Sequence, residues 1–121
     1  MDFRSNIPLY LQVMDDIKKK IITGDLALGA RLPSTRELAV QYQINPNTAV
    51  RVYNELESQG ITFTRRGIGT FVTEDPSWKN RLRREMAETL IGDLVGQLKE
   101  AGFTKQELLD TISRFYDQPS A

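Results

Sequence analysis

The chain has 121 residues, enough for one domain or for one small domain with an appendage. It contains neither cysteine nor histidine, which removes disulfides, the commonest metal ligands, cysteine nucleophiles and the usual general base. We therefore expect no catalytic residue, no metal site and no cofactor. Sixteen basic and sixteen acidic residues cancel, so a nucleic-acid partner must be argued from local charge. No stretch approaches the ~20 apolar residues of a membrane span and no signal-type apolar core opens the chain, so we expect a cytoplasmic protein without a membrane partner.

The first predicted helix covers residues 8–23. Its apolar residues recur at helical spacing: Tyr10, Val13, Met14, Ile17 and Ile21. Pro8 is suited to the first turn of a helix and Gly24 to its end. The three lysines at 18–20 fall off this apolar stripe and follow two aspartates, so we interpret them as a solvated face rather than a phosphate site.

Two shorter helices follow a turn-rich connection. Ser34 and Glu37 have the spacing of a capping box, which predicts the start of a short helix. The apolar side of that helix would consist of Leu38, Ala39 and Tyr42. Asn45 is placed to cap a further helix over 46–59, because Pro46 then takes the first helical position and a glycine follows the last.

A β-hairpin is predicted after these helices. The segments "ITFTR" and "GTFVT" alternate and are rich in β-branched and aromatic residues, as strands are. The connector "RGIG" contains two glycines that can adopt positive φ, which a tight turn requires. The order helix, helix, helix, hairpin therefore occupies about the first 75 residues.

The polar segment "TEDPSW" contains a proline and marks the predicted boundary between a domain at 1–76 and a tail at 77–121. A helical region follows from Trp78 to about Ala101. Its seam has heptad-like spacing and is the predicted dimerisation surface, formed by Ala87, Ile91, Leu94 and Leu98. About 45 tail residues are too few for a drug-sized cavity of about 300 Å³ within one subunit, and a pocket between subunits is the alternative. Whether a small-molecule effector binds stays unknown.

The last predicted helix completes the tail. Gly102 ends the preceding helix, and Thr104 with Glu107 forms a second capping box. Its apolar stripe consists of Leu108, Leu109, Ile112, Phe115 and Tyr116. The predicted fold is mostly α with a small β-hairpin, namely a winged helix-turn-helix DNA-binding domain with a two-helix C-terminal dimerisation tail.

The helix over 46–59 has a polar face that suits a DNA major groove. Its members lie within about 40° of one another on a helical wheel, and they are Asn47, Arg51, Asn54 and Ser58. Asparagine can pair bidentately with adenine and arginine with guanine. No acid precedes Glu55, so the first turns would not oppose the phosphates. An ordinary surface helix without early acids is the alternative.

Other cations gather around this helix. Arg65, Arg66 and Gly67 form the predicted hairpin tip, and Arg36 lies in the first turn of its helix, where free N–H groups favour anions. Residues 31–72 hold five arginines and three glutamates, a local excess that the balanced total conceals. Each arginine taken singly could also be solvated.

The sequence resembles the DNA-binding domain of GntR-family transcriptional regulators over about residues 8–72, through "LPSTRELA", "NTAVRVYNELESQG" and "RRGIGTFV". The short tail is similar to that of the YtrA subfamily. The resemblance implies operator contacts, and the full predicted set is Ser34, Arg36, Asn45, Asn47, Thr48, Arg51, Arg65, Arg66 and Gly67. Val50 and Pro46 stand where many relatives have basic residues, so the base preference of better-known members does not transfer. We expect Val50 either to contact a thymine methyl or sugar, or to pack against the wing.

The leading prediction is a sequence-specific transcriptional regulator that acts as a repressor. It would read an inverted-repeat operator as a homodimer, with the helix at 46–59 in the major groove and the wing at 65–69 on the adjacent backbone or minor groove. Two other classes stay open: an enzyme that uses carboxylates or lysines, and a winged helix that binds proteins instead of DNA. The "RGIGT" turn is not a phosphate loop, since no Lys-Ser or Lys-Thr and no helix follow it.

Overall fold

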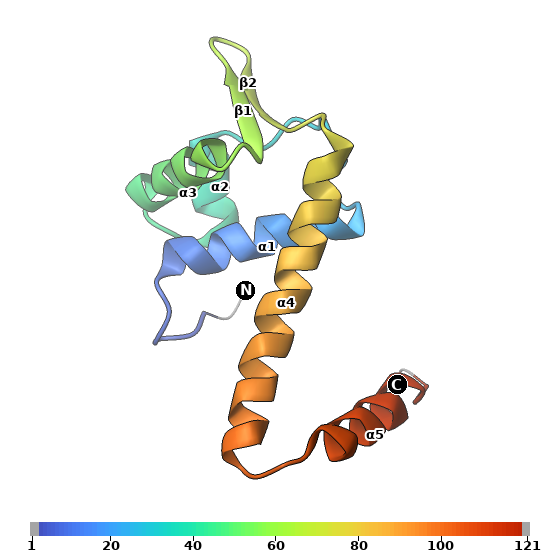
Figure 1. Ribbon diagram of the computed structural model, residues 1–121. Coiled ribbons are helices and arrows are strands. Elements are labelled where there is room, and N and C mark those ends of the chain that lie inside the picture. Colours follow the sequence, from blue (N-terminus) through green and yellow to red (C-terminus); the bar gives the residue numbers. More distant parts are fainter. Residues whose placement is uncertain (1–2, 120–121) are drawn as a thin grey trace. The chain divides into compact units, whose positions relative to one another are not determined.

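The computed structural model describes residues 3–119 (Figure 1). The chain divides into two compact units, one ending at Arg83 and the other beginning at Arg84. The sequence placed the domain boundary at 76, so the first compact unit is longer than the predicted domain. The additional residues belong to helix α4, which spans Pro76–Glu100. None of the helices formed by residues 3–119 is long and apolar enough to cross a membrane.

Three helices form the body of the first unit: α1 (Leu9–Thr23), α2 (Thr35–Tyr42) and α3 (Pro46–Ser58). The bounds of α1 and α3 agree with the predicted ranges to within one residue, and α2 begins directly after its predicted cap. Their ends follow from local chemistry. The amide of Gly24, at φ 88°, closes α1 on the carbonyl of Ile21. Ser34 and Glu37 form both hydrogen bonds of a capping box, and the side chain of Asn45 accepts from the backbone of Asn47 at 2.8 Å.

The hairpin pairs β1 (Thr62–Arg65) with β2 (Gly69–Val72) in antiparallel register. A third segment, predicted only as a turn-rich connection, lies on the other side of β2. Arg31 forms a bridge with Phe71, and the amide of Leu32 donates to the carbonyl of Thr70 at 2.8 Å. The segment around Arg31 therefore pairs with β2 through an isolated bridge at the side of the two-stranded sheet. The sequence signal was too weak to show it, because only one residue pair is involved.

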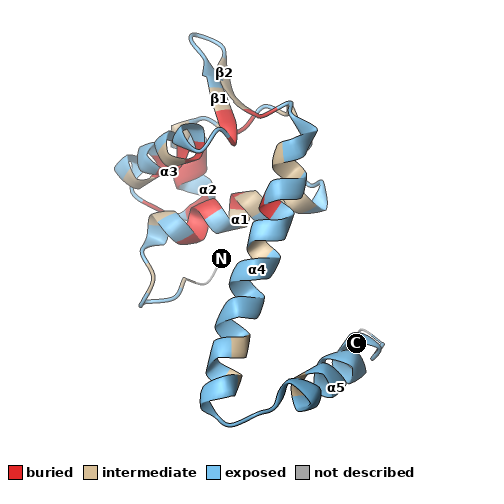
Figure 2. Ribbon diagram, viewed as in Figure 1, coloured by how far each residue is buried: buried red, intermediate tan, exposed pale blue. Residues whose placement is uncertain are grey.

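The core lies where the apolar faces of α1, α2 and α3 meet under the base of the hairpin (Figure 2). Its fully enclosed side chains are Val13, Ala49, Val52, Leu56 and Val72. Burying each large aliphatic side chain contributes about 1.5–3 kcal/mol. The first turns of α4 also join this core, since Leu82 is buried and Trp78 packs against it. A Cβ at Gly60 would lie 2.8 Å from the Trp78 ring, so the end of α3 needs glycine there.

The second unit contains the remainder of α4 and helix α5 (Lys105–Tyr116). The predicted capping box of α5 is confirmed, with both bonds between Thr104 and Glu107 present. Between residues 84 and 119, no side chain is buried. Of the predicted dimerisation residues, Ile91 and Leu94 are 56% and 47% exposed, Ala87 is exposed and Leu98 is half-buried. The apolar stripes of this unit thus find no cover within the described chain.

Candidate nucleic-acid interface

Helix α3 separates its residues into a buried face and an exposed polar face. The buried face comprises Ala49, Val52, Tyr53 and Leu56, and the exposed polar face comprises Asn47, Arg51, Asn54 and Ser58. The hydroxyl of Tyr53 donates to the carbonyl of Pro33 at 2.5 Å. Burial raises the pKa of Tyr53, so the hydroxyl remains a proton donor. Tyr53 thus fixes α3 against the segment that leads into α2.

The N-terminus of α3 carries three of the predicted DNA contacts. Asn47 is exposed and Thr48 is half-buried. The side-chain oxygen of Asn45 is already committed, because it caps the helix by accepting from the Asn47 amide at 2.8 Å. Pro46 occupies the first helical position. Asn45 therefore sets the start of the helix. The NH2 group of its side-chain amide is the part that is available to DNA.

The N-terminus of α2 carries two further predicted DNA contacts, Ser34 and Arg36. Arg36 is exposed there, as predicted. Ser34 uses its hydroxyl and its amide for the capping box with Glu37, each bond being 3.1 Å long. The bond that the Ser34 amide donates to the Glu37 carboxylate lowers the pKa of Glu37, and the Ser34 side chain and the charge of Arg31 lower it further. Ser34 thus caps α2, as Asn45 caps α3, although a DNA contact was predicted for both residues.

Arg51 makes a contact that the sequence did not predict. Its Cζ atom lies 3.7 Å from the centre of the Tyr10 ring on α1, a stacked cation–π arrangement. The helical spacing predicts Tyr10 only as part of the apolar stripe of α1, yet the residue is half-buried. The stack restricts the rotamers of Arg51 while the residue stays exposed. Only the tertiary fold brings these two positions together, so no local signal indicates the pair.

The wing tip has the predicted composition and geometry. The Ile68 amide donates to the carbonyl of Arg65 at 2.9 Å, and Gly67 between them has φ 77°, which favours glycine. Arg65, Arg66 and Gly67 are all exposed. Ile68, which no sequence signal marks, is 57% exposed beside them. Val50 on α3 is 43% exposed, so it is available to a ligand.

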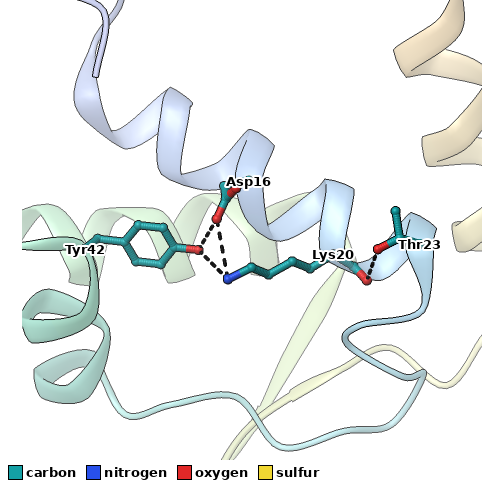
Figure 3. Close-up of polar contacts among 4 residues, drawn as sticks. All are labelled: Asp16, Lys20, Thr23 and Tyr42. Carbon is teal, nitrogen blue, oxygen red and sulfur yellow. Dashed lines mark hydrogen bonds and ion pairs between the residues drawn. The ribbon is translucent and has the colours of Figure 1, made fainter. Parts of the chain in front are cut away.

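The lysine run at 18–20 is only partly a solvated face. The hydroxyl of Tyr42 donates to Asp16 at 2.5 Å, and the Lys20 ammonium lies 3.3 Å from that hydroxyl and 3.5 Å from the carboxylate (Figure 3). Burial and the bond to Asp16 raise the pKa of Tyr42. Lys20 therefore joins α1 to α2, whereas Lys19 is exposed as predicted. The adjacent cavity of about 30 Å³ holds about one water molecule, far less than a drug-sized ligand.

A helix-turn-helix whose second helix exposes an acid-free polar face, followed by an arginine-tipped hairpin, defines a winged helix-turn-helix DNA-binding protein. The family model described as "Bacterial regulatory proteins, gntR family" matches residues 9–72, more than half of the chain. The chain belongs to the GntR family. It is a DNA-binding transcriptional regulator and not an enzyme.

Relatives extend the similarity beyond the winged domain. The uncharacterized HTH-type transcriptional regulator YhcF of Bacillus subtilis is 42% identical over 113 residues, which cover 93% of each chain. The HTH-type transcriptional repressor YtrA of the same organism is 43% identical over 75 residues, 62% of this chain and 58% of YtrA. The predicted likeness to YtrA is thereby confirmed.

Solved structures give the same assignment. A GntR family transcriptional regulator from Listeria monocytogenes is 32% identical with a TM-score of 0.87, over 93% of this chain and 98% of that chain. The DNA-binding domain of AraR, solved in complex with its operator ORX1, is 29% identical with a TM-score of 0.54, over 60% of this chain and 90% of that chain. The predicted fold class is confirmed.

Proposed function

We propose that this protein represses transcription by binding an inverted-repeat operator as a homodimer, with α3 in the major groove and the wing at 65–69 on the adjacent backbone or minor groove. The observation that carries the proposal is the exposed polar face of α3, which contains no acid before Glu55 and is backed by fully buried side chains. A helix of this kind presents donors and acceptors to base edges. Repression is favoured by the printed name of the relative YtrA, a transcriptional repressor.

Different residues of the proposed interface would have different roles. Asn47 and Arg51 are exposed on the groove-facing side of α3 and have the chemistry for bidentate base contacts. Arg36 at the start of α2 and the arginines of the wing have the chemistry for phosphate contacts. Ser34 and Asn45 would act mainly by setting the helix ends, because their oxygens already accept backbone amides. The base contacts therefore concentrate in the first two turns of α3.

The homodimer is proposed from the tail. Its exposed apolar side chains include Leu90, Ile91, Leu94, Leu109, Ile112 and Phe115. Large apolar stripes of this kind mark interaction surfaces in soluble proteins. A second copy of the chain is the fitting partner. A single recognition helix binds DNA weakly, and two linked helices bind more tightly because the second contact forms at a high effective concentration. A two-fold dimer would also place half-sites about 34–36 Å apart.

Selection of bound duplexes from a random pool, followed by substitution, tests this function. The selected sequences should form an inverted repeat whose half-sites lie about one helical turn apart. Arg36→Ala should weaken binding without unfolding the protein. Arg51→Ala should cost about 1–3 kcal/mol and relax preference at one base pair if Arg51 reads a base, or lower the salt slope by about one if it contacts a phosphate.

The substitutions require a charge-matched control. Lys19→Gln removes one exposed cation from α1 and should leave both the affinity and the salt slope unchanged. Thermal unfolding of every variant separates loss of contact from loss of fold. Retained affinity and specificity in both arginine variants would refute the placement of α3, and selection of an unrepeated site would refute the two-fold dimer.

A further inference from the structure

We propose that Arg31 is a DNA-backbone contact of the wing, acting together with Arg65 as one cationic face on the phosphates. The inference rests on the proposed placement of the wing against DNA, and it concerns a residue that lies outside the hairpin.

Strand register places Arg31 on the outer face of the wing. Arg31 bridges Phe71 of β2, which in turn pairs with Phe63 of β1. Residues directly opposite one another in antiparallel strands have side chains on the same face of the sheet. The rings of Phe63 and Phe71 are stacked on that face with their centres 5.6 Å apart. The opposite face is directed toward the core, since Val72 and Thr62 are buried.

The absence of a side chain at Gly69 leaves room for the side chain of Arg31. A Cβ built on Gly69 would lie 2.9 Å from Nε of Arg31 and 3.4 Å from its Cζ, so the guanidinium crosses the position that a side chain would occupy. Gly69 also pairs with Arg65, which is two residues beyond Phe63 and therefore on the same face. The Cζ atom of Arg65 lies 5.7 Å from the centre of the Phe63 ring. The guanidinium of Arg31 thus lies over Gly69 from one side of β2, and Arg65 pairs with the same glycine from the other side.

The charge of Arg31 is not neutralised by a close partner. Glu37 is near enough for Arg31 to contribute to its lowered pKa. However, Arg31 forms no ion pair within 4.0 Å in the part of the chain from 3 to 119, and the Glu37 carboxylate already accepts from the Ser34 amide at 3.1 Å. Arg31 is also exposed. An unpaired guanidinium whose fork is free to bind fits the paired oxygens of a DNA phosphate.

The bridge of Arg31 to β2 thereby extends the cationic surface from the wing tip toward the base of the hairpin. With Arg65 and Arg66 alone, only the tip of the wing would contact DNA, whereas Arg31 adds a cation on the side of β2 opposite β1. Phosphate contacts position a protein on the duplex and are independent of base sequence. The expected signature is therefore a change in salt dependence that is shared by all sequences.

The test measures the binding of full-length Arg31→Gln and Arg31→Lys to two duplexes over a series of salt concentrations. One duplex is selected from a random pool, and the other is an unselected duplex of equal length. Arg31→Gln should weaken binding to both duplexes and reduce the salt slope by about one, because one phosphate contact is lost. Arg31→Lys should keep the slope, and the control Lys19→Gln should match the unmodified protein.

Two results would overturn the inference. An unchanged salt slope in Arg31→Gln, in a protein whose binding is weakened by Arg36→Ala or Arg51→Ala, means that Arg31 does not reach DNA although α2 and α3 do. A loss of affinity with an unchanged slope means that Arg31 supports the wing instead of contacting phosphate. If none of the arginine variants loses binding, the proposed function fails together with this inference.

Discussion

The two units of the chain use the same local devices but differ in where their apolar side chains go. Each has a helix that begins with a complete capping box, at Ser34 in the first unit and at Thr104 in the second. In the first unit, the apolar stripes meet one another, so that Val52 and Leu56 are 0% exposed. In the second, Phe115 is 63% exposed. Helix formation is thus encoded locally in both units, whereas burial is completed only in the first.

This difference has an energetic consequence. Isolated helices shorter than about 12–15 residues are marginal in water, and most helix stability in proteins comes from packing. Helix α5 has 12 residues and no buried side chain. The first unit therefore supplies its own stability, while the second must obtain it from a surface outside its described residues. The proposed homodimer would supply such a surface.

The largest expected effect comes from removing the second unit. A fragment that ends at Arg83 should remain folded, because the described core lies before this point. It should be monomeric and bind the selected duplex about 10²–10⁴-fold more weakly, since the two recognition helices are no longer linked. Analytical ultracentrifugation and a binding titration measure both quantities. A fragment that binds as tightly as the whole chain, or a full-length monomer at micromolar concentration, would mean that the tail has another task.

A shorter fragment locates the end of the first unit. A chain that stops at Pro76 lacks Leu82, which is 4% exposed, and Trp78, which covers Gly60. We expect this fragment to stay folded but to melt at a lower temperature than the fragment ending at Arg83, because buried apolar area is lost. Equal melting temperatures would show that these turns of α4 add nothing to the core.

Matched leucines in the two units should respond differently. Leu38→Ala removes a side chain that is 1% exposed, and it should cost about 2–5 kcal/mol of unfolding free energy through the lost transfer and the cavity. Leu94→Ala removes one that is 47% exposed, so the melting of the first unit should not change. Its effect should instead be a larger dimer dissociation constant in sedimentation. A stability loss of equal size in the monomeric states of both variants would mean that Leu94 is buried within its own unit, as Leu38 is.

The sequence was sufficient for most of the fold because its signals are local. Helical spacing, the two capping boxes and the Asn-Pro start of α3 each involve neighbours in the chain, and all are confirmed. The α2–α3 turn shows what local signals omit. Gln43 adopts φ 54°, a conformation that glycine or asparagine favours, and nothing in glutamine itself predicts it.

The missing parts of the site are the non-local ones. The stack of Arg51 on Tyr10 and the bridge of Arg31 to Phe71 join residues that are far apart in the chain. A side chain's type indicates what it can bind, but not which neighbour already holds it. The residue types of the candidate interface could therefore be predicted, whereas the positioning of its arginines required the tertiary structure.

A smaller effect, on DNA affinity, is expected at Tyr10, whose ring in the first unit is only half-buried. Tyr10→Leu removes the ring beneath Arg51 and should weaken DNA binding by about 0.5–2 kcal/mol, because the guanidinium loses its cation–π support. Tyr10→Phe keeps the ring and should bind normally. A double-mutant cycle with Arg51→Ala measures the coupling. If the effects of Tyr10→Leu and Arg51→Ala are simply additive, the stack does not position Arg51 for DNA.

The smallest expected effect compares the two capping boxes directly. Ser34→Ala and Thr104→Ala should each cost about 1 kcal/mol of helix stability, the first appearing in the melting of the winged domain and the second in dimerisation. The bonds from Ser34 and Thr104 lower the pKa of Glu37 and Glu107 below the ordinary 4.5. A carboxyl whose folded pKa is lowered stabilises the fold above its unfolded pKa, and this contribution is lost as the pH falls through the folded pKa.

The pH dependence distinguishes the carboxylates from the hydroxyls in these boxes. Between pH 7 and about 5, both carboxylates stay ionised in the folded and unfolded states, so their contribution should be constant. Below the ordinary value of 4.5, Glu37→Gln should lose less stability on acidification than the unmodified protein, as followed by the melting of the fragment ending at Arg83. Residue 107 lies outside that fragment, so Glu107→Gln is tested in the full chain. There it should alter only the acid sensitivity of dimerisation. Identical acid profiles of Glu37→Gln and the unmodified fragment would show that the cap carboxylate does not contribute, and that the box at α2 depends on the serine hydroxyl alone.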